Sequence, residues 1–166
     1  MPVHDEDVHE YGQGFLRLEQ PALHFVSLLL ADRELVRAYK SGKFPNLAGI
    51  AEEHKKSEVI RLAIQIATTY RLIHWSSKSK SSSAIVGRLC QDDSVKQWID
   101  LTMLEACHKI IHAELVAFES RKLPRSYSNF FKPRLHLAGT KGRKTWLAVV
   151  DALPFANAAI EPSNAS

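Results

Sequence analysis

Cysteine and long apolar runs are both scarce in this chain. The two cysteines, Cys90 and Cys107, stand in mostly apolar segments, where we expect them to be reduced core thiols of a cytoplasmic protein. The apolar stretch ALHFVSLLLA is too short to cross a bilayer, which takes about 18 to 20 residues. The sequence therefore predicts no membrane-spanning helix and no membrane partner.

Acidic residues are absent from 120–150, a segment that holds eight basic residues. The first ten residues, by contrast, carry four acidic residues and no lysine or arginine, which is unlike a signal peptide or a mitochondrial presequence. A segment of one charge sign attracts polyanions. The RNA-binding residues that we expect there are Arg121, Arg125, Lys132, Arg134, Lys141, Arg143 and Lys144.

The overall composition is that of an ordinary globular domain. With 166 residues, of which 45% are hydrophobic and 24% charged, the chain can bury a core without disulfides or a structural metal. The length favours one domain. We expect a single helical domain at 13–160, between flexible tails at 1–12 and 161–166.

Hydrophobic periodicity predicts a mainly α fold. Main helices are expected at about 21–42, as one bent helix or two, at 57–75 and at 95–120. Alternation around a Gly-containing turn predicts a small C-terminal β-hairpin at about 134–150, while IVGRLC and the residues after Pro154 are expected to form short helical pieces. The predicted architecture is an antiparallel bundle of about four main helices with this hairpin.

The stretch EACHKIIHAE, residues 105–114, is the densest cluster of reactive side chains. On a helical wheel of 95–120, Glu105, His108 and His112 lie within about 60° of one another. The i,i+4 spacing of the histidines suits metal ligation, but no further ligand stands out and the HExxH motif is absent. We predict no metal and no cofactor, with a His/Glu metal site as a distant third interpretation.

Glu114 falls on a different side of the same wheel, within the apolar arc. A carboxylate in that position needs a hydrogen-bond donor, because burying it without one is costly. The candidate donors in the sequence are His74, Tyr70 and Trp146. We therefore expect Glu114 to be a buried structural anchor.

The segment CHKIIHAE resembles the (R)NxxIIH segment of HEPN-type helical proteins. The following LHLAGTKGRKTWLAVVDALPF resembles a hairpin found after such helices, so the resemblance covers about 95–155. It implies a helical bundle that dimerises, and a relation to ribonuclease toxins or defence proteins. The motif histidine corresponds to His112 and its polar position to His108, while Cys107 stands where the family has arginine.

The same resemblance implies a catalytic set for RNA cleavage. His112 and His108 would transfer protons, and Lys109 would stabilise the charge that develops on the phosphate. Because the family arginine is missing, the sequence leaves open whether the protein is an enzyme or only binds RNA. The alternative from another class is a non-catalytic helical interaction module, with the histidines at an interface with a protein partner.

Aromatic residues are interleaved with the basic residues of 120–150, at Tyr127, Phe130, Phe131 and Trp146. Exposed rings among cations suit single-stranded nucleic acid, because bases stack on them. Packing of the hairpin on the helices would use the same rings. Both interpretations stay open at the level of the sequence.

Overall fold

The computed structural model describes residues 17–43, 45–77, 83–123 and 129–161. The tails expected at 1–12 and beyond residue 161 lie outside these ranges. The helices are α2 (Glu19–Leu30), α3 (Asp32–Lys40), α4 (Pro45–Ser77), α5 (Met103–Ile111) and α6 (Ala152–Ile160). The strands are β1 (Ile85–Cys90), β2 (Trp98–Thr102), β3 (Leu115–Lys122), β4 (Asn129–Lys141) and β5 (Lys144–Asp151).

The mainly α bundle predicted from the sequence is wrong, because the described residues also form a large sheet. Its five strands are all antiparallel and follow the order β2-β1-β5-β4-β3. The hairpin expected at about 134–150 corresponds to β4 and β5, which are two strands of this sheet. The fold is therefore a mixed one, in which helices cover an antiparallel sheet.

The long helix predicted at 95–120 is also wrong, since this segment is divided among β2, α5 and β3. Its apolar residues satisfy a period of two at both ends. In β3, for example, Val116 and Phe118 pack against the core, whereas Leu115 and Ala117 are exposed. Only the central nine residues keep the helical period and form α5.

The segment IVGRLC forms β1 and not the short helical piece that we expected. Gly87 lies on β1 where this strand pairs closely with β5. A Cβ atom at this position would lie 1.9 Å from the carbonyl oxygen of Val149 on β5. The glycine therefore permits the backbones of β1 and β5 to pair at normal distance.

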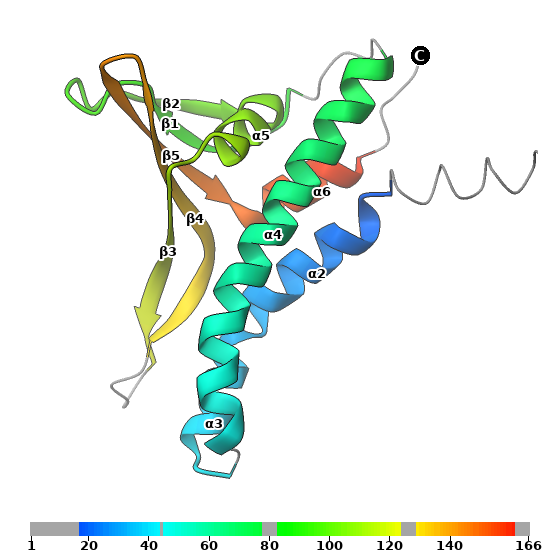
Figure 1. Ribbon diagram of the computed structural model, residues 1–166, viewed down its shortest axis with the longest axis vertical. Helices are drawn as coiled ribbons and strands as arrows, with labels where there is room; N and C mark the ends of the chain where they lie inside the picture. Colours follow the sequence, from blue (N-terminus) through cyan, green and yellow to red (C-terminus); the bar gives the residue numbers. More distant parts are fainter. Residues whose placement is uncertain (1–16, 44, 78–82, 124–128, 162–166) are drawn as a thin grey trace, which may run out of the picture.

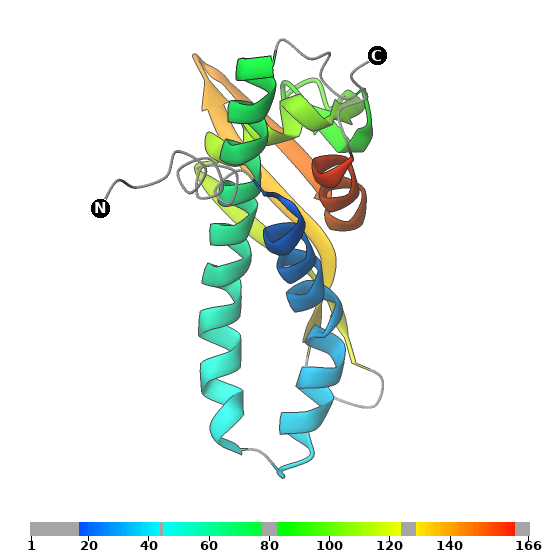
Figure 2. The same ribbon diagram turned by 90° about the vertical axis from the view of Figure 1, so that its right-hand side faces the viewer.

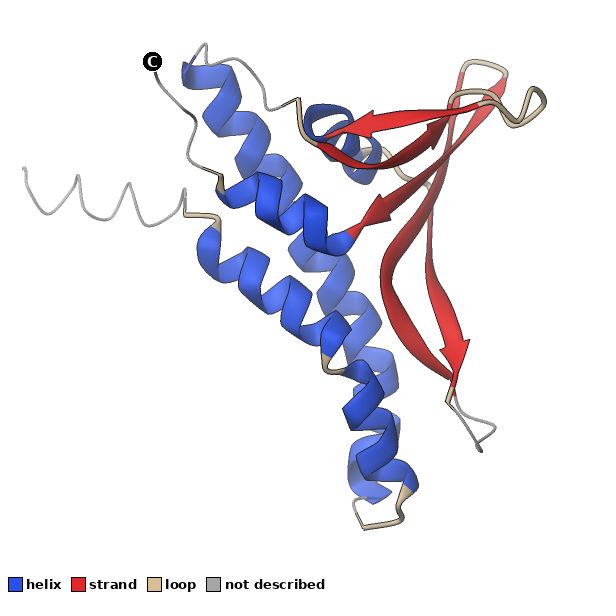
Figure 3. Cartoon of the chain, turned by 180° about the vertical axis from the view of Figure 1, so that it is seen from behind, coloured by secondary structure: helices blue, strands red, loops and turns tan. Residues whose placement is uncertain are grey.

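The helices all lie on one side of the sheet, which we call its inner face (Figures 1 and 3). The strand register places Leu89, Ala148 and Leu137 side by side on this face, where all three are buried. Above them, the rings of Phe25 on α2 and Phe155 on α6 meet edge to face with centroids 6.0 Å apart. The main hydrophobic core thus fills the space between the helical layer and the inner face.

Helices α2, α3 and α4 form an elongated layer (Figure 2). Helices α2 and α3 follow one another along α4, which is 33 residues long and includes the helix expected at 57–75. Val59, Leu62 and Ile66 form its buried side. None of the described helices combines the length and hydropathy needed to cross a bilayer.

A buried carboxylate ties the helical layer to the sheet. Asp32, in the first turn of α3, accepts a hydrogen bond from the ammonium of Lys55 on α4 and another, of 2.5 Å, from the backbone N–H of Phe131 on β4. Asp32 is 1% exposed and Lys55 is 7% exposed. The Lys55 ammonium also lies 4.6 Å from the centre of the Phe131 ring.

Replacing Asp32 with alanine is expected to lower the free energy of unfolding by about 3–5 kcal/mol, because Lys55 would remain buried without a counter-charge. Adding Lys55→Met should recover part of this loss. Chemical denaturation of the three variants measures both effects. Glu34→Ala is the control, because the Glu34–Arg37 pair is exposed and should contribute less than about 1 kcal/mol. If Asp32→Ala and Glu34→Ala lowered the free energy of unfolding equally, the buried Asp32–Lys55 pair would not have this stabilising role.

Candidate anion-binding site

An open cleft of about 560 Å³ lies at the end of the sheet where α5 meets the two hairpin connections. One side is the loop between β1 and β2, another is α5, and the third is the β4–β5 hairpin. The cleft combines basic, amide and apolar side chains. Its lining residues are Gln91, Asp92, Val95, Gln97, Ile99, Glu105, Lys109, Lys141, Lys144 and Trp146.

Lys109 is the most unusual residue of the cleft. It projects from α5 with 8% of its surface exposed, and its ammonium lies 4.5 Å from the centre of the Trp146 ring. Within the described residues the ammonium has no hydrogen bond or ion pair. Burial lowers the pKa of Lys109, Glu105 raises it and Lys141 lowers it further. The side chain therefore presents a cation that is only weakly compensated.

A glycine makes room for the ring that supports Lys109. Gly139 on β4 stands opposite Trp146 on β5, and a Cβ atom at Gly139 would lie 2.3 Å from Cζ2 of the indole. The same Cβ would lie 3.0 Å from the carbonyl oxygen of His112. The indole can lie flat against the strand only because this position has no side chain.

The hairpin connection adds further lysines to the cleft. Lys141 and Lys144 pair with each other at the end of the β4–β5 ladder, so both approach the cleft from the same turn. Lys144 forms an ion pair of 3.0 Å with Asp92, whose pKa is lowered by hydrogen bonds from Ser94 and from Lys144. Lys141 has no such carboxylate within the described residues and is exposed.

His108 and His112 lie together near the cleft, at the C-terminal end of α5. Their ring centroids are 4.5 Å apart, as the i,i+4 spacing predicts, and both side chains are exposed. Burial lowers the pKa of His108, and the charges of His112, Lys109, Arg71 and Lys141 lower it further. Every charged group that shifts this pKa is basic, so this end of α5 carries a positive field.

Glu105, His108 and His112 were the candidate metal ligands in the sequence. In the described ranges no three His, Cys, Asp or Glu side chains gather closely enough to hold a metal ion. Glu105 lines the cleft with Lys109, while the two histidines stack on each other. Glu105, His108 and His112 therefore do not make the three-residue ligand set that a helical wheel suggested.

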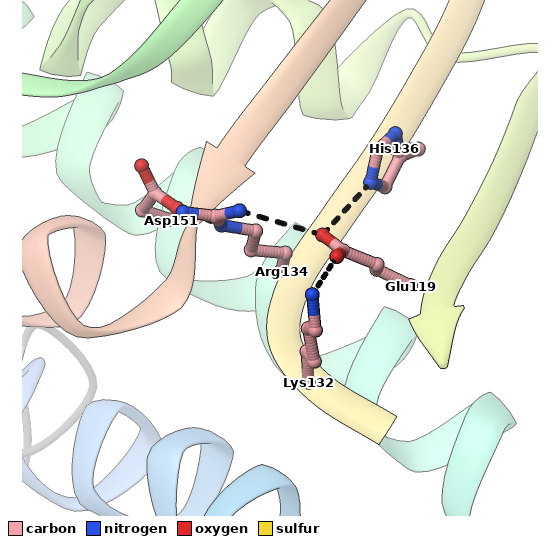
Figure 4. A network of polar contacts seen from close by, with 5 residues as sticks. All are labelled: Glu119, Lys132, Arg134, His136 and Asp151. Atoms are coloured by element: carbon pink, nitrogen blue, oxygen red, sulfur yellow. Dashed lines mark hydrogen bonds and ion pairs between the residues drawn. The ribbon is translucent and has the colours of Figure 1, made fainter. Parts of the chain in front are cut away.

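The predicted RNA-binding residues that the structure describes are spread over β3, β4 and the β4–β5 turn, and they do not form one patch. Lys132 donates a hydrogen bond to Glu119, and Arg134 forms an ion pair of 3.6 Å with Glu119 and donates a hydrogen bond of 2.6 Å to Asp151 (Figure 4). These cations are compensated within the molecule. Arg121 is exposed on β3, and Arg125 lies outside the described residues.

The remaining three predicted cations, Lys141, Arg143 and Lys144, lie at the β4–β5 turn. This turn lies beside the cleft and the two histidines. The structure therefore brings Lys109, Lys141 and Lys144 together in the cleft, with His108 and His112 next to them. It leaves Arg121, Lys132 and Arg134 elsewhere on the sheet.

The expectation for Glu114 is wrong. Glu114 is exposed between α5 and β3, and it accepts hydrogen bonds from the backbone N–H (3.0 Å) and the hydroxyl (2.6 Å) of Thr140. Those hydrogen bonds lower its pKa. His74, Tyr70 and Trp146 are not the donors, because the long helix that placed Glu114 in an apolar arc does not exist.

Sequence reasoning missed the loop that forms one wall of the cleft. Val95 and Gln97 were predicted to lie inside the 95–120 helix and Asp92 near its start. In the structure, these residues and Gln91 connect β1 and β2. The sequence did offer a signal for a different wall, the one formed by Trp146: Gly139, since a glycine inside a strand pattern often marks a close approach to a neighbour. The aromatic residue that it faces, Trp146, was considered only for stacking or packing.

Comparison with known proteins adds no relative. The chain matches no protein-family model, no curated protein and no solved structure. The HEPN resemblance stays a prediction, and the site must be interpreted from its own geometry.

Gly139→Ala is expected to displace the Trp146 indole, because the added methyl would overlap with Cζ2 and Cε2. Overpacking of this kind costs about 1–3 kcal/mol of stability. The measurements are urea unfolding and tryptophan fluorescence, with Ala138→Gly as a control on the neighbouring, half-buried position. An unchanged spectrum and an unchanged unfolding midpoint in Gly139→Ala would contradict this packing.

Proposed function

We propose that this protein binds a small organic anion, a phosphate or carboxylate with an apolar body, in the cleft between α5, the β1–β2 loop and the β4–β5 turn. The single observation that carries the proposal is Lys109, a largely buried residue that lines this cleft with its ammonium against the Trp146 ring. A buried charge is costly unless it is paired. A bound anion would supply the missing counter-charge.

The size and the walls of the cleft support a small ligand. About 560 Å³ falls within the range of roughly 300–1,000 Å³ found for small-molecule sites. Val95 and Ile99 provide an apolar wall, and the amides of Gln91 and Gln97 can donate hydrogen bonds. Lys109 and Lys141 would hold the anionic head while the apolar wall holds the body.

The proposal is for binding and not for catalysis. Within the described residues neither His108 nor His112 forms a hydrogen bond or ion pair through its ring. A general base is usually oriented by a second polar group. Arg71, Lys109 and Lys141 instead provide the positive field that attracts an anion to this end of the molecule.

Lys109→Met should weaken anion binding by a factor of about 30 or more, since removing one member of a buried charge pair costs about 2 kcal/mol or more. In the ligand-free protein the same change should raise the melting temperature, because an uncompensated buried charge has been removed. Calorimetric titration with phenyl phosphate and benzoate measures the first effect, and thermal unfolding measures the second. Inorganic phosphate and acetate test the contribution of the apolar wall.

Lys43→Met is the matched control, because Lys43 is an exposed lysine beyond the end of α3. It should change neither binding nor stability by a measurable amount. A lower melting temperature for ligand-free Lys109→Met, together with no binding of either organic anion to the parent protein, would mean that Lys109 only supports Trp146. That result would overturn the proposed function.

RNA contact is a second candidate function, favoured by the exposure of Lys141 and Arg143 at the β4–β5 turn beside the cleft. We propose that single-stranded RNA binds here with an affinity that falls steeply with salt, by a log–log slope of roughly −0.7 for each phosphate neutralised. Fluorescence anisotropy of a labelled oligonucleotide measures this slope.

Lys141→Ser with Arg143→Ser should reduce the magnitude of the slope by about 1.4, since two phosphate contacts are lost. Lys40→Ser with Lys43→Ser removes the same charge at the far end of the helical layer and should leave the slope nearly unchanged. Equal effects from both double variants would show that only net charge matters. We also propose a cytoplasmic location, because the two thiols are free and buried.

A further inference from the structure

The face of the sheet turned away from the helices, which we call the outer face, carries one row of side chains that is wholly apolar. The strand register assigns its side chains to two rows that cross all five strands. One row is Trp98, Cys90, Leu147, Ala138 and Leu115, and the other is Asp100, Arg88, Val149, His136 and Ala117.

No described helix covers this face (Figures 1 and 3). An antiparallel sheet with one face in water usually carries polar residues on that face. Here the outer face instead holds a groove of about 260 Å³ between Trp98 and Leu115, floored by Leu147 and Ala138. Trp98 is 43% exposed and Leu115 is 62% exposed. Exposed apolar side chains gathered around a groove are a candidate contact surface for a partner.

The charged residues around the groove indicate what covers it. On one side, Glu119, Lys132, Arg134 and Asp151 compensate one another within the chain (Figure 4). This side of the face therefore presents no unbalanced charge to a partner. A strongly acidic or strongly basic partner would gain nothing from it.

On the other side, Arg88 and Asp100 stand opposite each other in β1 and β2. Their side chains are exposed and form no ion pair or hydrogen bond within the described residues. Two neighbouring charges of opposite sign are what a symmetric dimer can use, because in a two-fold interface each contact occurs twice. Arg88 of one copy would meet Asp100 of the other, and the reverse.

We propose that the outer face is the interface of a homodimer, in which two copies pack sheet against sheet and each inserts Leu115 into the groove of the other. Sheets packed in this way lie about 10 Å apart. Five strands about 4.8 Å apart make the face roughly 20 Å wide. Such a face lies at the small end of stable interfaces, so the dissociation constant should be on the order of 1–100 µM.

The HEPN resemblance also implies a dimer, but that dimer would use the predicted 95–120 helix. The dimer proposed here uses the outer face of the sheet. It is also independent of the anion-binding cleft, whose walls lie around α5 and the two hairpin connections. Trp98 belongs to the outer face, whereas the following residue, Ile99, belongs to the cleft. Adjacent residues of β2 thus serve the two faces of the sheet.

Sedimentation equilibrium of the full chain from about 1 to 300 µM tests the proposal. Leu115→Ser should raise the dimer dissociation constant at least tenfold while the melting temperature of the monomer changes little, because Leu115 is exposed. Leu72→Ser is the matched control, since Leu72 lies on α4 and is 63% exposed, compared with 62% for Leu115. It should leave the dissociation constant unchanged.

Charge reversal gives a second, sharper test. Arg88→Glu and Asp100→Lys should each weaken the dimer, because each creates like-charge contacts across the two-fold axis. The double variant should restore the dissociation constant to within about threefold of the parent, because both reciprocal pairs return with exchanged signs. A monomer at every concentration would overturn the proposal. So would a dimer broken by Leu72→Ser and not by Leu115→Ser, or a double variant as weak as the single ones.

Discussion

The carboxylate of Asp32 is the contact on which the position of the sheet depends. It begins α3, accepts a hydrogen bond from Lys55 on α4 and accepts another from the backbone of Phe131 on β4. Three elements that are far apart in the sequence therefore share one buried acceptor. Because Asp32 is only 1% exposed, water cannot take its place as the acceptor for these two donors. Because the Phe131 ring lies against Lys55 and stacks on Phe118 of β3, the same contact fixes the β3–β4 hairpin against the helical layer.

The cleft forms at the opposite end of β4, where the helical cover is short. Helix α5 has nine residues, packs on the sheet through Met103, Ala106, Cys107 and Ile110, and lines the cleft with Glu105 and Lys109. The β4–β5 turn extends past it, so the Trp146 ring is covered by a lysine stem and not by a further turn of helix. A longer α5, such as the one predicted at 95–120, would have filled this space with apolar side chains. The shortness of α5 is thus the structural origin of the cleft.

Sequence patterns predicted the helices better than the sheet, for a physical reason. The helix at 57–75 has a one-sided apolar stripe over many turns, whereas Ile99, Met103, Ile110 and Phe118 fit both a helical and an alternating period. No glycine or proline marks the junctions around Thr102 and Ala113, so local chemistry does not reveal the breaks. The adjacency of His108 and His112 was readable, because it needs only i,i+4 spacing. The compensation of Lys132 and Arg134 was not readable, because Glu119 and Asp151 reach them through strand pairing.

The two buried lysines of the described structure can be compared directly. Lys55 is 7% exposed and Lys109 is 8% exposed, and each ammonium lies about equally close to an aromatic ring, 4.6 Å from Phe131 and 4.5 Å from Trp146. A cation–π contact alone contributes about 0.5–2 kcal/mol, which does not offset the burial of an ammonium. At Lys55 the remaining cost of burying the charge is offset by the ion pair with Asp32. At Lys109 the nearest carboxylate, Glu105, raises the pKa without forming an ion pair. Lys109 instead lines the cleft, where the proposed bound anion would supply the counter-charge that Asp32 supplies to Lys55.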